Sequence, residues 1–352
     1  MSVLSLARPE LLSLKPYSSA RMEAGRAAVM LNANESPYAP FEHDSLGLNR
    51  YPDPQPAALL QLLASDYGVS PQQLFVGRGS DEAIDLLVRA FCRAGEDAIL
   101  ISPPTFGMYA VAAGVQGARV VAVPLDPAQD FALDIDAILQ AELERPVKLV
   151  FVCAPNNPTG GDVPLAKVRE LALALQDRAL VVVDEAYVEF AGRDSAATLL
   201  DAHPNLAVLR TLSKAYGLAG ARLGALIAAP EIIGLIRRIM APYPLPTPCV
   251  AAALAAFSDS ARAARAAHLA QSKAERKRLA DALAAHPAIR HVWPSAANFL
   301  VFRVDDAHAT WQQLLARGVI VRDVSHYLGL ANCLRVSVGT PEENDRFLHA
   351  LA

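Results

Sequence analysis

The chain has 352 residues, 53% of them hydrophobic and 19% charged, with a formal net charge of −4, which excludes a disordered chain and argues against a general affinity for nucleic acid. The longest apolar run, 249–257, is much shorter than the roughly 20 residues of a membrane-spanning helix, and residues 1–21 lack the long apolar block of a secretory signal. The four cysteines and eight histidines are scattered, so we expect no disulfide framework, no metal site and a reducing, cytoplasmic location.

The first forty or so residues read as an irregular arm that includes the loop LNANESPYAP (31–40). A helix is expected after two glycines in GRGSDEAIDLLVRAFC (77–92), where Ile84, Leu87 and Val88 recur at the spacing of one helix face. Its glycine-rich entry would leave backbone N–H groups free to bind an anion. Taken alone, this stretch is better explained by an ordinary helix cap.

From Asp97 onward, short apolar runs alternate with helical patterns. Several runs are continuous and rich in β-branched residues, which is typical of strands covered by helices on both faces. We therefore predict an α/β fold with a mainly parallel sheet and an active crevice at the carboxyl ends of its strands. The expected strands are 98–102, 119–125, 148–155, 179–187 and 206–212, and 164–178 is an expected helix.

The pattern changes at APYPLPTP (241–248), where four prolines in eight residues cannot continue a helix. An Ala-rich amphipathic stretch over about 249–285 follows, then expected strands at 298–304, 319–324 and 333–339 and helices near 307–317 and from Pro341. These elements predict a second, smaller α+β domain. We assign 1–45 to the arm and part of the small domain, 46–245 to a large cofactor-binding domain and 246–352 to the small C-terminal domain.

Polar residues follow three of the expected strands. The turn APNNPTG (154–160) comes after the strand 148–155, Asp184 ends the next, and Ser213, Lys214 and Arg222 follow the strand 206–212. Each has a simpler explanation by itself, namely an ordinary turn, a carboxylate paired with a backbone N–H or an arginine, and a surface lysine. Because the carboxyl ends of parallel strands meet at one edge of a sheet, we expect these groups together.

A ligand with a phosphate, an aldehyde and a basic ring nitrogen would use all of these groups. Its aldehyde would form a Schiff base with Lys214, so the amine in this mostly apolar run would no longer be a costly free ammonium. Its phosphate would pair with Arg222, and Asp184 would keep a pyridine nitrogen protonated. The pattern therefore predicts pyridoxal 5′-phosphate as the cofactor.

The whole chain resembles the fold-type I pyridoxal-phosphate-dependent aminotransferases, and within them the histidinol-phosphate aminotransferases. The run TLSKAYGLAGARLG (211–224) is highly specific for the fold type. Softer features carry the likeness to the subfamily, chiefly LNANE (31–35), RGSDEAI (78–84) and VVVDEAYVEF (181–190). Further similar stretches are RYPDP (50–54), PPTFGMY (103–109), NFLVFR (298–303) and CLRVSVGT (333–340).

The resemblance implies a role for each matched residue. Lys214 would carry the cofactor and act as the base once a substrate amine releases it, Asp184 would bind the pyridine nitrogen, and Tyr109 would stack on the ring. The other implied cofactor contacts are Asn157 and Tyr187 at the phenolic oxygen, Ser80, Asp81, Ser213 and Arg222 at the phosphate, and Tyr51 from across a dimer interface.

For the substrate, the resemblance makes Arg335 the carboxylate-binding arginine of the small domain. Arg322 would bind a phosphate, unless it simply pairs with Asp323 or Glu35. Arginine forks can bind either anion through two parallel hydrogen bonds. Tyr17, Asn34, Tyr51 and Asn157 are the other implied substrate contacts.

The activity implied by the resemblance is a ping-pong transamination in histidine biosynthesis. L-Histidinol phosphate and 2-oxoglutarate would give imidazole acetol phosphate and L-glutamate, in a homodimer. An aromatic amino-acid aminotransferase and a threonine-phosphate decarboxylase-like enzyme remain alternatives with the same cofactor. A non-catalytic regulator is disfavoured because no basic N-terminal segment is present, and a nicotinamide dehydrogenase because GRGSDE lacks the third glycine of G-x-G-x-x-G.

Overall fold

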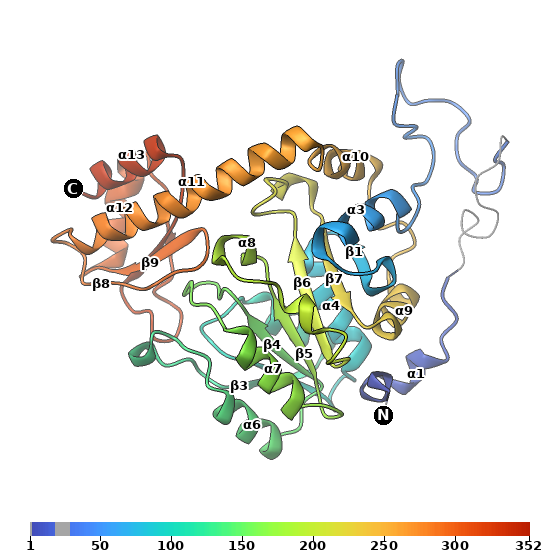
Figure 1. Ribbon diagram of the computed structural model, residues 1–352, viewed down its shortest axis with the longest axis horizontal. Coiled ribbons are helices and arrows are strands. Elements are labelled where there is room, and N and C mark those ends of the chain that lie inside the picture. Colours follow the sequence, from blue (N-terminus) through green and yellow to red (C-terminus); the bar gives the residue numbers. More distant parts are fainter. Residues whose placement is uncertain (1, 18–28) are drawn as a thin grey trace.

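The computed structural model describes residues 2–17 and 29–352, which form two sheets (Figure 1). The larger sheet has the strand order β1-β7-β6-β5-β4-β2-β3. In it β7 is antiparallel to its neighbours β1 and β6, and the other pairs are parallel. Its strands are Leu74–Gly77 (β1), Ala98–Ile101 (β2), Arg119–Ala122 (β3), Leu149–Cys153 (β4), Leu180–Asp184 (β5), Leu206–Thr211 (β6) and Gly224–Ala228 (β7).

The predicted α/β class is confirmed, and each of the five strands expected from apolar runs is present in the large sheet. Every residue of β5 is buried because alternate side chains enter two different cores. Val181 and Val183 pack on one face of the sheet, while Leu180 and Val182 pack on the other. Burial on both faces is the reason that this strand reads as a continuous apolar run.

Helices cover both faces of the large sheet (Figure 1). One layer contains α4 (Ser80–Phe91), α5 (Met108–Gln116) and α9 (Pro230–Ile239), and the other contains α3 (Ala57–Tyr67), α6 (Ile135–Glu144) and α7 (Leu165–Ala174). The face predicted for the first helix is confirmed, since Ile84, Leu87 and Val88 are completely buried. Short connecting elements are α8 (Val188–Ala191), η2 (Pro71–Gln73), η3 (Pro127–Gln129), η4 (Ala196–Leu199) and η5 (Ala219–Ala221).

The smaller sheet is antiparallel, with the order β10-β11-β9-β8. Its elements are β8 (His291–Val292), β9 (Phe299–Arg303), β10 (Arg322–Asp323) and β11 (Cys333–Ser337), with α12 (Ala307–Ala316) and α13 (Pro341–Leu351). The strand expected over 319–324 is therefore reduced to two residues. Trp293 and Val301 of this region join the core of the large sheet, so the two sheets share packed side chains.

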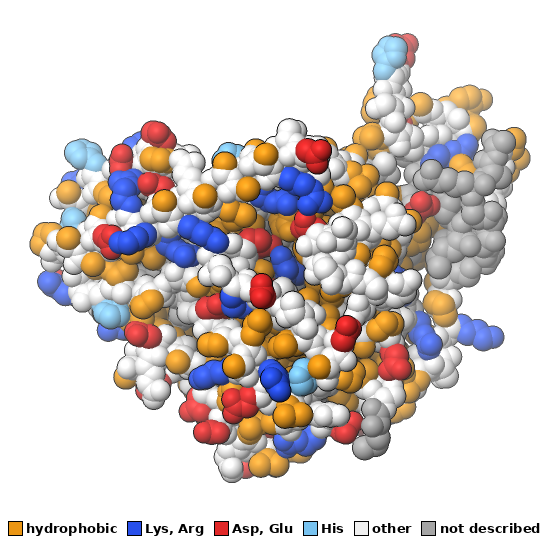
Figure 2. Space-filling model, in the orientation of Figure 1, with side chains coloured by type: hydrophobic (Ala, Val, Ile, Leu, Met, Phe, Trp, Pro, Cys, Tyr) orange, Lys and Arg blue, Asp and Glu red, His pale blue; other side chains and the backbone are white. Residues whose placement is uncertain are grey.

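The Ala-rich stretch forms two helices, α10 (Thr247–Ala255) and α11 (Asp259–Ala284). The break falls where the Ser258 hydroxyl accepts a hydrogen bond from the backbone N–H of Ala261 (3.3 Å) and caps α11. α11 runs from α10 to the small sheet (Figure 1), and basic side chains gather along it (Figure 2). Arg276 of α11 donates hydrogen bonds to the carbonyl of Ala297, just before β9 of the small sheet (2.7 Å), and to the carbonyl of Phe190 in α8 (3.3 Å).

The N-terminal region begins with η1 (Val3–Leu6) and α1 (Pro9–Leu12), which contact α9. Residues 29–50, which include the described part of the arm, lie far from the small sheet (Figure 1). Across the described residues, no helix has the length and apolar character needed to cross a membrane.

Candidate active site

The carboxyl ends of β4, β5 and β6 define the candidate site. Asp184 is the last residue of β5 and lies in register with Cys153, the last residue of β4. β6 ends at Thr211, and the loop after it carries Ser213 and Lys214. The crevice of an open α/β sheet lies at this edge, so the fold brings these strand-end residues to one place.

Asp184 is a buried carboxylate with only 2% of its surface exposed. Its Oδ2 accepts a hydrogen bond from the Tyr109 hydroxyl (2.7 Å), and its Oδ1 accepts one from the backbone N–H of Ala186 (3.1 Å). Burial raises the pKa of Asp184 to about 6, and these two hydrogen bonds oppose the rise. The sequence left open a backbone N–H or an arginine as the partner, and the structure supplies the N–H together with a phenol.

Tyr109 does not lie where its ring could stack on a cofactor. The ring is completely buried and stacks on Phe151 of β4, with centroids 4.6 Å apart and planes inclined by 13°. Phe106 makes a T-shaped contact with this ring, with centroids 5.6 Å apart, and is itself only partly buried. The expected stacking role of Tyr109 is therefore wrong, because packing against Phe151 takes its ring face; the neighbouring Phe106 keeps exposed surface at this position.

Lys214 is exposed rather than buried in its mostly apolar run. The apolar residues of that run belong to β6 and β7, and the loop between these strands carries the cations. The Nζ atom of Lys214 lies 5.7 Å from the centre of the Tyr187 ring. The pKa of Lys214 is lowered, first by partial desolvation and then by the positive charges of Arg335 and Arg222.

An anion cradle lies at the start of α4. Arg222 donates to Asp81 Oδ2 (3.0 Å) and to the Ser213 hydroxyl (3.4 Å). Gly79 precedes the helix with φ +84°, and none of the described side chains caps its first backbone N–H groups. β7 passes close by, since a Cβ at Gly224 would lie 2.3 Å from the backbone nitrogen of Ser80. Free N–H groups, a hydroxyl and a guanidinium are the donors that a phosphate prefers.

Arg335 of β11 reaches from the small sheet to the large one. Its guanidinium donates to Asn157 Oδ1 and lies 5.1 Å from the centre of the Phe299 ring. Tyr187 meets the same Phe299 ring edge-on at 5.2 Å. Arg335 is only partly exposed, and this desolvation lowers the pKa of its guanidinium.

Arg322 lies directly opposite Arg335 in the β10–β11 pair and is exposed. Both arginines line a cavity of about 750 Å³. The two acids proposed as simple partners of Arg322 have other contacts, since Glu35 forms an ion pair with Arg50 (3.0 Å) and Asp323 accepts the N–H of Ser325 (2.8 Å).

The remaining predicted residues lie on the arm or at its base. Tyr17 is 66% exposed, and Asn34 is exposed with φ +56°. Tyr51 stacks on Tyr243, with ring centroids 4.4 Å apart. In Figure 1 residues 29–50 lie on the opposite side of the molecule from the small sheet.

Asn156 supports the site but was not among the predicted residues. It is buried, donates to Pro104 O and Thr159 Oγ1 (2.8 Å each), and accepts from the Thr105 hydroxyl (2.9 Å). It thereby ties the loop after β2 to the loop after β4, which presents Asn157. The doubled asparagine was the available signal, but only the contacts distinguish the structural amide from the one facing the cleft.

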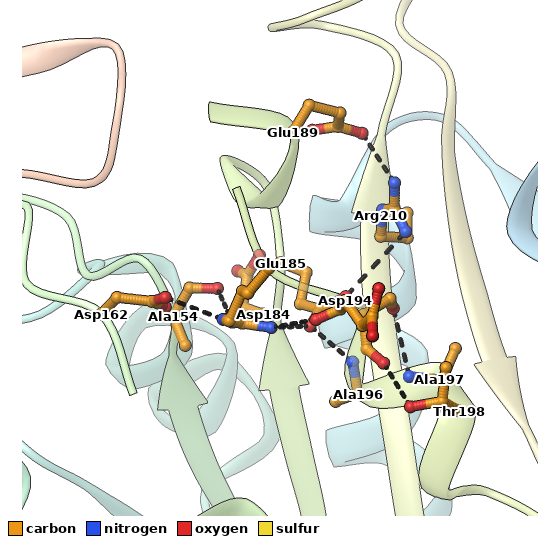
Figure 3. A network of polar contacts seen from close by, with 12 residues as sticks. Ala154, Asp162, Asp184, Glu185, Glu189, Asp194, Ala196, Ala197, Thr198 and Arg210 are labelled. Atoms are coloured by element: carbon orange, nitrogen blue, oxygen red, sulfur yellow. Dashed lines mark hydrogen bonds and ion pairs between the residues drawn. The ribbon is translucent and has the colours of Figure 1, made fainter. Parts of the chain in front are cut away.

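A buried ionic network lies beside Asp184 (Figure 3). Glu185 has no exposed surface, and Arg193 donates to its Oε1 (2.9 Å). Arg193 also donates to Asp162 (2.8 Å) and to the carbonyl of Ala154 (3.1 Å). One arginine therefore joins the loop after β5 to the loop that carries Asn157.

Comparisons with known proteins agree with this geometry. A family model described as aminotransferase class I and II matches residues 22–351. A histidinol-phosphate aminotransferase of Stenotrophomonas maltophilia (strain R551-3) is 54% identical over 351 residues, which cover 99% of this chain and 96% of that protein. The crystal structure of histidinol-phosphate aminotransferase from Sinorhizobium meliloti in complex with pyridoxal 5′-phosphate has a TM-score of 0.78 at 29% identity, covering 98% of this chain and 96% of that one. The enzyme of the same name from Clostridium acetobutylicum has a TM-score of 0.78 at 25% identity, covering 86% and 90%.

Proposed function

Because the chain belongs to the class I and II aminotransferases, we propose that it transfers the amino group of L-histidinol phosphate to 2-oxoglutarate with pyridoxal 5′-phosphate as cofactor. The products are imidazole acetol phosphate and L-glutamate, in histidine biosynthesis. The observation that carries this proposal is the convergence of Lys214, Asp184 and the Arg222 cradle at one sheet edge. The full-length likeness to histidinol-phosphate aminotransferases supports the choice of substrate.

The residues of the site fit the cofactor group by group. Arg222, Ser213 and the N–H groups of Ser80 and Asp81 would hold its phosphate, where no side chain caps α4. Asp184 would face the ring nitrogen, and Asn157 and Tyr187 would face the phenolic oxygen. When bound, pyridoxal phosphate supplies an electron sink that stabilises the carbanion formed at the substrate Cα.

Lys214 is the proposed base. Its lowered pKa increases the fraction of neutral amine near neutral pH, and only the neutral amine can accept a proton. Its Nζ would take the proton from the substrate Cα and return it to the cofactor carbon. Asp184, when ionised, would hold the proton on the ring nitrogen throughout.

Arg335 and Arg322 are the proposed anion-binding pair for both substrates. The ping-pong cycle needs one pocket that accepts a phosphate ester and then the carboxylates of 2-oxoglutarate. Two guanidinium groups opposite each other on neighbouring strands can form paired hydrogen bonds with either anion. Tyr17, Asn34 and Tyr51 would complete this pocket from the arm.

A homodimer would supply those arm residues. Apolar side chains of the arm are at the surface (Figure 2), including Leu31, Tyr38 and Phe41, which are 86%, 79% and 58% exposed. Exposed apolar surface of this kind marks an interaction site, and we propose that Tyr51 enters the site of the second copy. We also propose a cytoplasmic location, because all four cysteines are free thiols and three of them are buried.

Kinetics with three amino donors test the function. Histidinol phosphate should be the best donor by a wide margin, measured as keto product formed with 2-oxoglutarate. A preference for phenylalanine would instead identify an aromatic aminotransferase. Release of CO₂ from phosphothreonine would identify a decarboxylase, which the same pair of arginines would also suit.

A further inference from the structure

Tyr109 lies next to the candidate cofactor site, but neither face of its ring is exposed to that site. Its ring stacks on Phe151 (centroids 4.6 Å apart, planes inclined by 13°) and makes a T-shaped contact with Phe106 (5.6 Å, 84°). The side chain has no exposed surface. Its polar atom is nevertheless used, because the hydroxyl donates to Asp184 Oδ2 at 2.7 Å.

We propose that Tyr109 is a positioning residue whose hydroxyl keeps the Asp184 carboxylate ionised and directed at the ring nitrogen of the cofactor. This inference rests on the proposed function. The residue would act through Asp184 and would not touch the substrate or the cofactor.

The electrostatics of the pocket explain why such a donor is needed. A protonated Asp184 cannot hold a proton on the ring nitrogen, and burial favours the protonated form. The negative charges of Asp81 and Glu185 act in the same direction. Three groups favour the ionised form of Asp184 instead: the Ala186 N–H, the Tyr109 hydroxyl and the positive charge of Lys214.

Two other groups face this carboxylate, the thiol of Cys153 and the phenol of Tyr187. Burial raises the pKa of both, so both stay neutral. The pKa of Tyr109 is also raised, by burial and then by the charge of Asp184, so its hydroxyl keeps its proton and remains a donor. Among the described residues, Tyr109 supplies the one side-chain hydrogen bond to Asp184, and the other hydrogen bond comes from the backbone N–H of Ala186.

Tyr109→Phe removes the hydroxyl while retaining the ring that stacks on Phe151. The affinity of the apoprotein for pyridoxal phosphate should fall about 10- to 100-fold, because a hydrogen bond to a charged group is lost. The same measurement is made with the carbocyclic analogue, in which a C–H replaces the ring nitrogen. Its affinity should change less than about twofold, since it offers Asp184 no proton to hold.

Tyr67→Phe is the matched control, because Tyr67 is also buried and its ring lies against Arg210 (4.5 Å) instead of Asp184. It should leave both affinities unchanged. Circular dichroism checks that each variant folds. If Tyr109→Phe does not fold, Tyr109→His, which keeps a ring N–H donor, is measured with the same two compounds and should retain part of the selectivity for the ring nitrogen.

The pH dependence gives a second readout. Loss of the hydroxyl should raise the pKa of Asp184 further. As the pH is lowered, the affinity for pyridoxal phosphate should therefore begin to fall at a higher pH in Tyr109→Phe than in the wild type. Equal losses for the two compounds, or no loss for either, would overturn the inference. A wild-type protein that bound pyridoxal phosphate but did not transaminate histidinol phosphate would overturn only the proposed substrate.

Discussion

Arg335 and Asn157 join the two sheets through a single hydrogen bond across the candidate site. The arginine comes from β11 of the small sheet and the asparagine from the loop after β4 of the large one. A substrate anion bound to Arg335, as proposed above, would act on a group already in contact with the proposed cofactor pocket. We therefore expect substrate binding and the relative position of the two sheets to be coupled through this pair.

Replacing Arg335 by lysine tests the proposal that both substrates share one anion-binding pocket. The charge is kept, but the planar fork that binds two oxygens is lost. We expect kcat/KM to fall about 10- to 100-fold for histidinol phosphate and for 2-oxoglutarate alike, a loss of about 1.4–2.7 kcal/mol. Arg346→Lys is the control, because Arg346 lines the same cavity from α13. A loss confined to one of the two substrates would contradict the shared pocket.

Lys214→Ala should reduce transamination by at least about a thousandfold, because it removes both the attachment point of the cofactor and the base. Borohydride treatment of the wild type, followed by peptide mapping, should find the cofactor fixed to Lys214. The variant should still bind pyridoxal phosphate reversibly through the Arg222 cradle. Turnover that persisted in Lys214→Ala would refute the assigned base.

The lowered pKa of Lys214 makes a separate prediction for the apoprotein. A lysine with a lowered pKa loses its proton at a lower pH, so its reactivity toward an acylating reagent should rise below the usual lysine value of about 10.4. Mass spectrometry of the labelled peptide, measured as a function of pH, gives the midpoint. Arg335→Met removes one of the repelling charges and should move the midpoint upward. An unchanged midpoint would exclude Arg335 as a cause.

The sequence was sufficient to predict which residues lie at the strand ends, but not how the aromatic residues around them pack. Asp184 and Lys214 were located correctly because continuous apolar strands fix where a parallel sheet ends. Phe106 and Tyr109 are both aromatic and three residues apart, and only packing against Phe151 decides which of them is buried. The role proposed for Tyr51 would depend on a second chain, which no local pattern describes.

Asp184→Asn should lose activity and yet stabilise the apoprotein. The folded-state pKa of about 6 lies above the ordinary value for aspartate of about 3.9. Between these values the folded state binds more protons than the unfolded state, so the stability contributed by Asp184 falls as pH rises from about 4 to 6. Asparagine removes that dependence. Urea unfolding should show a gain of about 1–3 kcal/mol at pH 8 and a smaller gain at pH 4; equal gains would contradict it.

Arg193→Met should destabilise the protein by about 2–4 kcal/mol, because it leaves the carboxylate of Glu185 buried without its closest ionic partner (Figure 3). Arg210 cannot replace it, since its guanidinium lies 3.9 Å from Glu185 and already pairs with Glu189 at 2.7 Å. The double variant Arg193→Met with Glu185→Gln should lose less than the sum of the two single losses, because the uncompensated charge is then absent.

Arg178→Met is the control, as it breaks a pair with the buried Glu142 away from the site. If both arginine variants lower stability but only Arg193→Met also raises the KM for histidinol phosphate, the network positions the loop of Asn157. An unchanged KM would limit Arg193 to a structural role.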